Sequence, residues 1–322
     1  MGLFDSLKRD KKPAETVMRE QHQSVDDDIV IDTIEVVERE AKPPVVERAP
    51  ESKPIKTLKD KAPVTHVVGQ TKVVAIINQK GGVGKSTTAI NLSAALGELG
   101  KQVLLVDLDP QGNSSSGLGI EKSQVKNCVY DVLLSDVPIE DVIIPDVCEG
   151  LDLVPATINL AGAEVELVSE MARENRLKDA VGSLRGKYDY VFVDCPPSLG
   201  LLTVNALVAA DKLLIPIQCE FYALEGVTKL LDSMKRVKSR LNPTLDIFGV
   251  LLTMYDGRTT LSKQVVEEVR GYFGKTVFST LIPRTVKLSE APSFGQPITQ
   301  YDPVGKGAQS YMSLAKEVVQ RG

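Results

Sequence analysis

The chain has 322 residues, of which 43% are hydrophobic and 25% are charged, and its formal net charge at pH 7 is −5. This acidic balance excludes a globally basic nucleic-acid binder, so any contact with DNA must come from a local patch. No apolar run reaches the roughly 18 residues of a transmembrane helix. The 4 cysteines show neither C-x-x-C pairing nor metal-binding spacing, which is typical of reduced thiols in the cytoplasm.

The N-terminal segment differs in composition from the rest of the chain. It mixes Lys, Glu, Asp, Pro and Val, has almost no aromatic residues, and includes the acidic cluster Asp26-Asp27-Asp28. Such a segment buries too little apolar surface to offset the entropy lost on ordering. We therefore predict a disordered, charged tail over residues 1–70 and one globular domain over residues 71–322.

From residue 71 onward, apolar strand patterns alternate with helix patterns. The strand patterns are near-continuous apolar runs, as expected where both faces of a sheet are buried. The pattern predicts an α/β fold, with a mostly parallel, twisted sheet and helices on both faces. The expected strands are 73–78, 102–107, 151–154, 189–194, 212–217, 246–253 and 277–282. The expected helices are 85–99, 127–134, 159–184, 201–209, 222–241, 260–273 and 307–320.

The first strand runs directly into the sequence KGGVGKST at residues 80–87, and a helix follows. This order is typical of a P-loop NTPase, in which backbone N–H groups and a helix N-terminus point at a polyphosphate. Lys85 supplies a charge for the β- and γ-phosphates, the Ser86 hydroxyl suits Mg²⁺, and Thr87 can donate to the α-phosphate. The predicted phosphate-binding residues are Gly81, Gly82, Val83, Gly84, Lys85, Ser86 and Thr87.

Aspartates end two of the buried strands. Asp107 and Asp109 are separated by one residue, so on an extended backbone their side chains point the same way. Asp194 closes the strand 189–194, at the sheet edge where open α/β sheets bind ligands. A carboxylate there can hold a Mg²⁺-bound water, which is the Walker B pattern. We therefore expect the three aspartates to lie beside the phosphate loop.

The helix expected at 222–241 carries a cluster of basic residues. Spacings of three and four residues place Lys235 and Lys238, with Arg236 and Arg240, on adjoining faces. Alone, such a cluster is usually a solvated helix face. If it binds DNA, phosphate neutralisation would give affinity without sequence preference. Arg258 and Lys287 could extend the same basic surface.

The loop resembles the deviant Walker A motif of the ParA/MinD ATPases, because Lys80 stands ahead of the glycines. Further runs are similar to the ParA (Soj-like) partition ATPases in particular, from Lys72 to the end of the sequence. They are DPQGN from Asp109, QCEFYALEG from Gln218, LLTMYDGRT from Leu251 and IPRTVKLSEAP from Ile282. Ser86 stands where many relatives have threonine, and either hydroxyl can bind Mg²⁺.

The resemblance implies a mechanism and a set of partners. In the family, ATP and Mg²⁺ are held between two subunits, and the residue matching Lys80 reaches the nucleotide of the other subunit. Asp109 would position the attacking water in a slow ATPase, with Asp107 near the magnesium shell. The resemblance also implies non-specific binding to double-stranded DNA, a ParB-like partner, and a cytoplasmic, nucleoid-associated protein that partitions a chromosome or plasmid.

Adenine contacts are also suggested by the resemblance, at Met254, Pro283 and Arg284. Three other functions stay open at this point. A MinD-like membrane protein would need a basic amphipathic anchor, which the C-terminal helix lacks, so no stable membrane association is expected. An iron–sulfur relative would need paired cysteines. An ATPase that positions some other cargo would share nearly all of these residues.

Overall fold

The structure, a computed structural model, describes residues 69–221 and 223–321. The predicted disordered tail therefore lies outside the described residues, apart from Gly69 and Gln70. Within the described part of the chain, no helix combines the length and the apolar character that crossing a bilayer requires.

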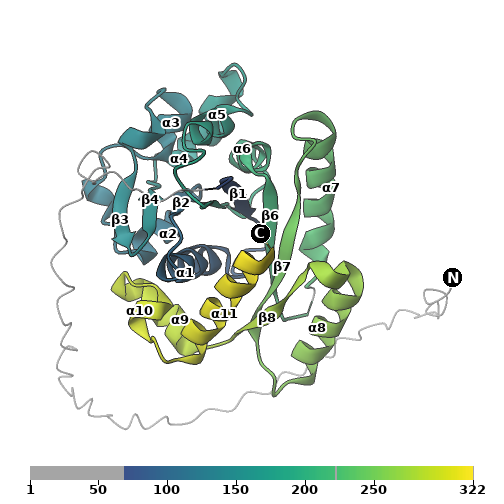
Figure 1. Cartoon of the computed structure of the whole chain (residues 1–322). Coiled ribbons are helices and arrows are strands. Elements are labelled where there is room, and N and C mark those ends of the chain that lie inside the picture. The colour runs from purple at the N-terminus through teal and green to yellow at the C-terminus, as the bar shows by residue number, and fades with distance from the viewer. Residues whose placement is uncertain (1–68, 222, 322) are drawn as a thin grey trace, which may run out of the picture. The chain divides into compact units, whose positions relative to one another are not determined.

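The described residues form one eight-stranded sheet with the spatial order β3-β4-β2-β5-β1-β6-β7-β8. Neighbouring strands are parallel throughout, except for the antiparallel edge pair β3–β4, which confirms the predicted mostly parallel sheet (Figure 1). The strands are β1 Lys72–Ile76, β2 Val103–Asp107, β3 Ile144–Cys148, β4 Leu151–Val154, β5 Tyr190–Asp194, β6 Lys212–Gln218, β7 Asp246–Tyr255 and β8 Val277–Pro283.

Helices cover both faces of this sheet, also as predicted. Apolar side chains of α3 to α8 pack against one face, and those of α1, α9, α10 and α11 pack against the other. The helices are α1 Lys85–Glu98, α2 Asn113–Gly117, α3 Val129–Leu134, α4 Leu160–Glu166, α5 Arg176–Gly182, α6 Leu201–Ala209, α7 Glu225–Arg240, α8 Thr260–Phe273, α9 Val286–Glu290, α10 Ile298–Tyr301 and α11 Lys306–Arg321.

The central strands β2 and β5 are buried along their whole length. Each buried valine or leucine contributes about 1.5–3 kcal/mol to folding, so the apolar runs fix these strands in the core. Both strands end in an aspartate, and Asp107 and Asp194 stand opposite each other in the register. The fold therefore places two buried carboxylates side by side at the carboxyl edge of the sheet.

Helix α1 packs on one face of the sheet and contacts the C-terminal helices α10 and α11. The hydroxyls of Thr88 and the fully buried Tyr311 in α11 are 3.3 Å apart. The Asn91 side chain donates to the Thr87 carbonyl at 2.7 Å and accepts from the backbone N–H of Ile298, in α10, at 2.6 Å. Contacts with α10 and α11 thus fix the position of α1, the helix that follows the glycine-rich loop.

The prediction of one continuous helix over 159–184 is wrong. The segment is divided into α4, a short 3-10 helix at Leu167–Ser169, and α5, and Ala172 between them has a left-handed φ of 50°. The Glu164 carboxylate accepts from the backbone N–H of Leu201 at 2.8 Å, at the start of α6. Tertiary contacts of this kind override the helical pattern of the segment.

Strand β3 was not predicted because it is a short edge strand. It contains Pro145, and its burial pattern does not alternate. A tight connection joins it to β4, with Gly150 at a left-handed φ of 65°. A Cβ on Gly150 would lie 2.6 Å from the carbonyl oxygen of Lys101. Only glycine fits this turn.

We expect Gly97→Ala, in the last turn of α1, to destabilise the protein. A Cβ there would lie 2.0 Å from the Glu149 carbonyl oxygen, so the helix or the β3–β4 connection must move. We expect a loss of about 1–3 kcal/mol in the free energy of unfolding, measured by denaturant titration. Gly182→Ala is the matched control, because no atom lies within 4 Å of its Cβ and helix propensity favours alanine. Equal stability of the two variants would contradict this packing.

Candidate nucleotide-binding site

The glycine-rich loop connects β1 to α1 at the carboxyl edge of the sheet. Gly82 and Gly84 have left-handed φ values of 73° and 88°, which only glycine adopts without strain. No side chain caps the N-terminus of α1. Its first N–H groups are therefore available to an anion, and the helix dipole favours negative charge at this end.

Two polar side chains that the sequence did not single out hold the loop in place. Asn78 donates to the Pro216 carbonyl of β6 at 2.7 Å and accepts from the Lys80 N–H at 3.0 Å. Thr253, near the end of β7, donates to the Val83 carbonyl at 2.8 Å. Both are 2% exposed. Their signal was a polar residue at the end of an apolar strand, where a buried polar group must have a partner.

Lys85 points into the site, and its ammonium donates to the Lys80 carbonyl at 3.3 Å. The side chain is 7% exposed. Burial lowers the pKa of Lys85, and the nearby carboxylates of Asp194 and Asp109 oppose that shift. By contrast, Lys80 is half-buried. The two lysines thus occupy different environments, one inside the site and one at its rim.

Asp194 is fully buried at the end of β5. Its Oδ2 accepts from the Ser114 hydroxyl at 2.7 Å, whereas its buried Oδ1 has no hydrogen-bond partner among the described residues. Burial and the charge of Asp107 raise the pKa of Asp194 to about 7, while the Ser86 and Ser114 hydroxyls act in the opposite direction. A buried carboxylate oxygen without a partner, close to Ser86, fits Mg²⁺ or a water bound to it.

Both carboxylate oxygens of Asp107 accept hydrogen bonds, unlike those of Asp194. Its Oδ2 accepts from both the N–H and the hydroxyl of Ser115 at 2.7 Å, and its Oδ1 accepts from the Asp109 N–H at 3.3 Å. Burial raises the pKa of Asp107 to about 6, against the lowering effect of the Ser115 bonds. Asp107 therefore anchors α2 beside the site. The serines of α2 were missed, although the run NSSSG directly after the aspartates was their signal.

Asp109 lies in a tight turn just beyond β2 and is 6% exposed. Its carbonyl accepts from the Gly112 N–H at 2.8 Å, and its Oδ1 accepts from the Gln111 N–H at 2.9 Å. The structure thus brings Lys85, Asp107, Asp109 and Asp194 together, as the sequence predicted. Their roles in catalysis stay predictions.

The three predicted adenine contacts meet at the carboxyl ends of β7 and β8. Arg284 donates its backbone N–H to the Tyr255 carbonyl at 3.1 Å, and its guanidinium pairs with Glu220 and lies 4.0 Å from the Met254 sulfur. Met254 has a left-handed φ of 52°. Such strain in a non-glycine residue clusters at functional sites, so this strand end is suited to a ligand contact.

The six predicted DNA-binding residues differ in their partners. Arg258 pairs with Asp256 at 2.7 Å, Lys287 with Glu290 at 3.0 Å and Lys235 with Asp232 at 3.7 Å. Among the described residues, no carboxylate pairs with Arg236, Lys238 or Arg240, and all three are exposed on α7. The basic side chains of the predicted surface that form no close ion pair with a described residue therefore lie on the C-terminal half of α7, where the charge of Lys238 still helps to lower the pKa of Asp246.

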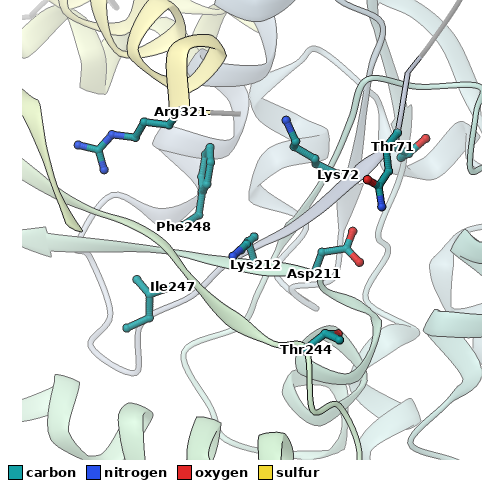
Figure 2. Close-up of a pocket in the computed structure, with 9 residues that line it drawn as sticks. Thr71, Lys72, Asp211, Lys212, Thr244, Ile247, Phe248 and Arg321 are labelled. Carbon is teal, nitrogen blue, oxygen red and sulfur yellow. The ribbon is translucent and has the colours of Figure 1, made fainter. Parts of the chain in front are cut away.

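A separate cavity of 610 Å³ opens at the opposite edge of the sheet. Figure 2 shows its lining, which comes from the amino ends of β1, β6 and β7 and from the end of α11. Lys72, Lys212 and Arg321 bring basic groups, and Phe248 and Ile247 bring apolar ones. The cavity does not contain the loop or the strand-end aspartates, so it is not the candidate site.

The chain is similar to known proteins over most of the described residues. A family model described as an AAA domain matches residues 71–247. The chain is 58% identical to the sporulation initiation inhibitor protein Soj of Bacillus subtilis over 251 residues, covering 78% of this chain and 99% of Soj. It is 54% identical to the chromosome partitioning protein ParA of Myxococcus xanthus, covering 78% of this chain and 88% of that protein.

A solved structure is similar over the same region. It is described as cobyrinic acid a,c-diamide synthase from Mycobacterium smegmatis with bound ADP and magnesium, with a TM-score of 0.69 and 41% identity, covering 78% of this chain and 94% of that one. This relative confirms, for the family, the predicted adenine nucleotide and Mg²⁺. Because 78% of the chain aligns with Soj and with ParA, at 58% and 54% identity, the chain belongs to the ParA/Soj family of chromosome-partitioning proteins within the ParA/MinD superfamily.

Proposed function

We propose that this protein is a slow, Mg²⁺-dependent ATPase that dimerises around ATP, binds DNA without sequence preference, and partitions chromosome or plasmid DNA with a ParB-like partner. The observation that carries the proposal is the pairing of two lysines in one glycine-rich loop with strand-end carboxylates. Lys85 lies inside the site beside Asp194 and Asp109, and Lys80 lies at its rim.

ATP binding is assigned to the loop and α1. The N–H groups of residues 81–87 would donate to the phosphates, and Lys85 would neutralise their charge. Ser86 and Asp194 would hold Mg²⁺, with Asp107 behind them. When bound there, Mg²⁺ would supply positive charge that offsets the negative charge developing on the phosphates during transfer. Met254, Pro283 and Arg284 would contact the base or ribose.

Hydrolysis is assigned to Asp109. Attack of water on a phosphoryl group needs mostly positioning and charge neutralisation, and the Asp109 carboxylate stands in the buried turn next to Lys85. The Gln111 N–H occupies only one of its oxygens. The other oxygen is therefore available to hold and orient a water.

Dimerisation is supported by apolar side chains exposed around the site. Ile158, Leu199 and Val286 are 69%, 40% and 71% exposed, and they follow the carboxyl ends of β4, β5 and β8. These three side chains would contribute apolar area to an interface at this edge of the sheet. A second copy of the chain facing this edge would cover them and would bring its Lys80 to the neighbouring nucleotide.

DNA binding is assigned to the exposed end of α7. Arg236, Lys238 and Arg240 carry positive charge that no described carboxylate pairs, and Lys235, Arg258 and Lys287 would add to the surface. Two such surfaces in one dimer would make affinity for the nucleoid depend on ATP. A ParB-like partner that stimulates hydrolysis would then release the dimer.

We expect Arg236→Glu with Lys238→Glu to lose DNA binding while keeping ATP-dependent dimerisation. Each removed phosphate contact lowers the salt dependence of log K by about 1, and affinity should fall at least about tenfold. Fluorescence anisotropy with duplex DNA at several salt concentrations measures both. Lys178→Glu with Lys316→Glu, exposed on α5 and α11, makes the same change in net charge and should bind DNA normally. Unchanged DNA binding by the α7 variant would place the surface elsewhere.

The function as a whole is tested by DNA co-sedimentation with ATP, with ADP and without nucleotide, each with and without a candidate ParB. ATP-specific sedimentation that ParB reverses is the expected result. Sedimentation independent of nucleotide would contradict the proposal. Sedimentation with lipid vesicles instead of DNA would favour the MinD-like alternative, in which the protein acts at a membrane or pole.

A further inference from the structure

Three side chains of the segment from Asp107 to Lys122 donate hydrogen bonds that help to fix it. Two are buried, where Ser115 donates to Asp107 and Ser114 donates to Asp194, both at 2.7 Å. These bonds fix the start of α2, but they do not reach the tip of the preceding turn. There Gln111 is exposed. The third point of attachment is at this tip.

Lys122 makes that third attachment. It begins a 3-10 helix at Lys122–Gln124, eleven residues beyond Gln111, and its ammonium donates to the Gln111 carbonyl at 2.5 Å. A hydrogen bond from a charged donor is stronger than a neutral one. The Gln111 N–H donates in turn to the Asp109 carboxylate at 2.9 Å. The carbonyl and the N–H of Gln111 thus link the Lys122 ammonium to the Asp109 carboxylate.

Gly112 permits this close approach. A Cβ on Gly112 would lie 2.7 Å from Lys122 Cε, 2.9 Å from its Nζ and 3.0 Å from the Ala156 carbonyl oxygen. Its φ of 58° is also left-handed. The turn therefore has room for the lysine side chain only because residue 112 is glycine.

We propose that Lys122 is a positioning residue for ATP hydrolysis, because its ammonium fixes the 109–112 turn that presents the Asp109 carboxylate. This inference rests on the proposed role of Asp109. Lys122 also lines a cavity of 310 Å³, together with Lys126, Ile158 and Asn159, among others. Among the described residues, no other cation is bonded to the Gln111 carbonyl, so truncating Lys122 would leave this carbonyl without its charged donor.

The test compares Lys122→Met with wild type in the full chain, at saturating Mg-ATP and DNA. A small displacement of a positioned group can cost as much as roughly a hundredfold in rate, and we expect kcat to fall at least about tenfold. KM and ATP-dependent dimerisation should stay within about twofold, because the loop residues are untouched. Lys122→Arg, which keeps the charge, should restore most of the activity. Lys126→Met removes a neighbouring exposed lysine and should behave as wild type.

Gly112→Ala provides a second probe, because its methyl group would displace Lys122. In this variant too, kcat should fall while KM stays close to the wild-type value. Wild-type kcat in Lys122→Met would overturn the proposal, and so would a loss of kcat matched by an equal loss of ATP affinity. Asp109→Asn in the same assay keeps the two ideas apart. If that variant hydrolyses ATP at the wild-type rate, the proposed role of Asp109 fails, whatever Lys122 does.

Discussion

Replacing Lys85 with alanine should abolish ATP binding. The ammonium is the cation that burial places beside Asp194 and Asp109, and without it the triphosphate would meet these two carboxylates with no buried cation between them. Removing one partner of a buried charge contact costs about 2–5 kcal/mol, and 3 kcal/mol corresponds to roughly a hundredfold weaker affinity. Isothermal titration calorimetry with Mg-ATP measures the loss.

Lys80→Ala is the matched control for this variant. It removes a lysine of the same loop, but one at the rim, so it should bind ATP as a monomer and fail to dimerise. Thermal unfolding checks that both variants fold. Wild-type ATP affinity in Lys85→Ala would contradict the assignment of the site. Wild-type dimerisation in Lys80→Ala would contradict only the crossing of that side chain to the other subunit.

Replacing Asp109 with alanine should stop hydrolysis and trap the ATP-bound dimer on DNA. Loss of a group that positions the nucleophile can cost roughly a hundredfold in rate, whereas ATP affinity depends on the loop. Phosphate release measures the rate, and light scattering with a DNA pull-down measures the trapped dimer. Rapid turnover by this variant would count against the mechanism.

Asp109→Asn separates charge from geometry. The amide oxygen can still accept from the Gln111 N–H, as Asp109 Oδ1 does at 2.9 Å, so the turn is kept while the negative charge is removed. If charge matters, Asn and Ala should be equally slow. Activity retained in Asn but lost in Ala would show that the carboxylate only shapes the turn.

The parts of the fold that the sequence predicted are those where burial decides the structure. The runs around Val103 and Val191 are apolar throughout because helices cover both faces of the sheet. The phosphate loop was recognisable because its glycines and its Lys-Ser pair have a fixed spacing. In both cases a local pattern and the tertiary structure require the same residues.

The parts that were missed depend on contacts distant in sequence. Glu164 caps α6, 37 residues away, and the segment around Ala172 breaks a helix that its own pattern favours. At the site, Thr253 holds the Val83 carbonyl from 170 residues away. No local pattern predicts such a partner.

Other missed contacts are local. Arg258 pairs with Asp256 and Lys287 pairs with Glu290, and these opposite charges lie only two and three residues apart in the sequence.

The attachment of α1 to α10 and α11 has a practical consequence for live-cell imaging. Tyr311 in α11 contacts the helix that follows the phosphate loop, and Arg321 donates to the carbonyls of Thr276 and Val277. A fluorescent tag joined after α11 would therefore be attached to a helix that packs directly against α1. A reporter inserted in the exposed turn at Gly186 would leave that linkage intact and would instead disturb the 2.7 Å hydrogen bond from the Gly186 N–H to the Thr71 hydroxyl.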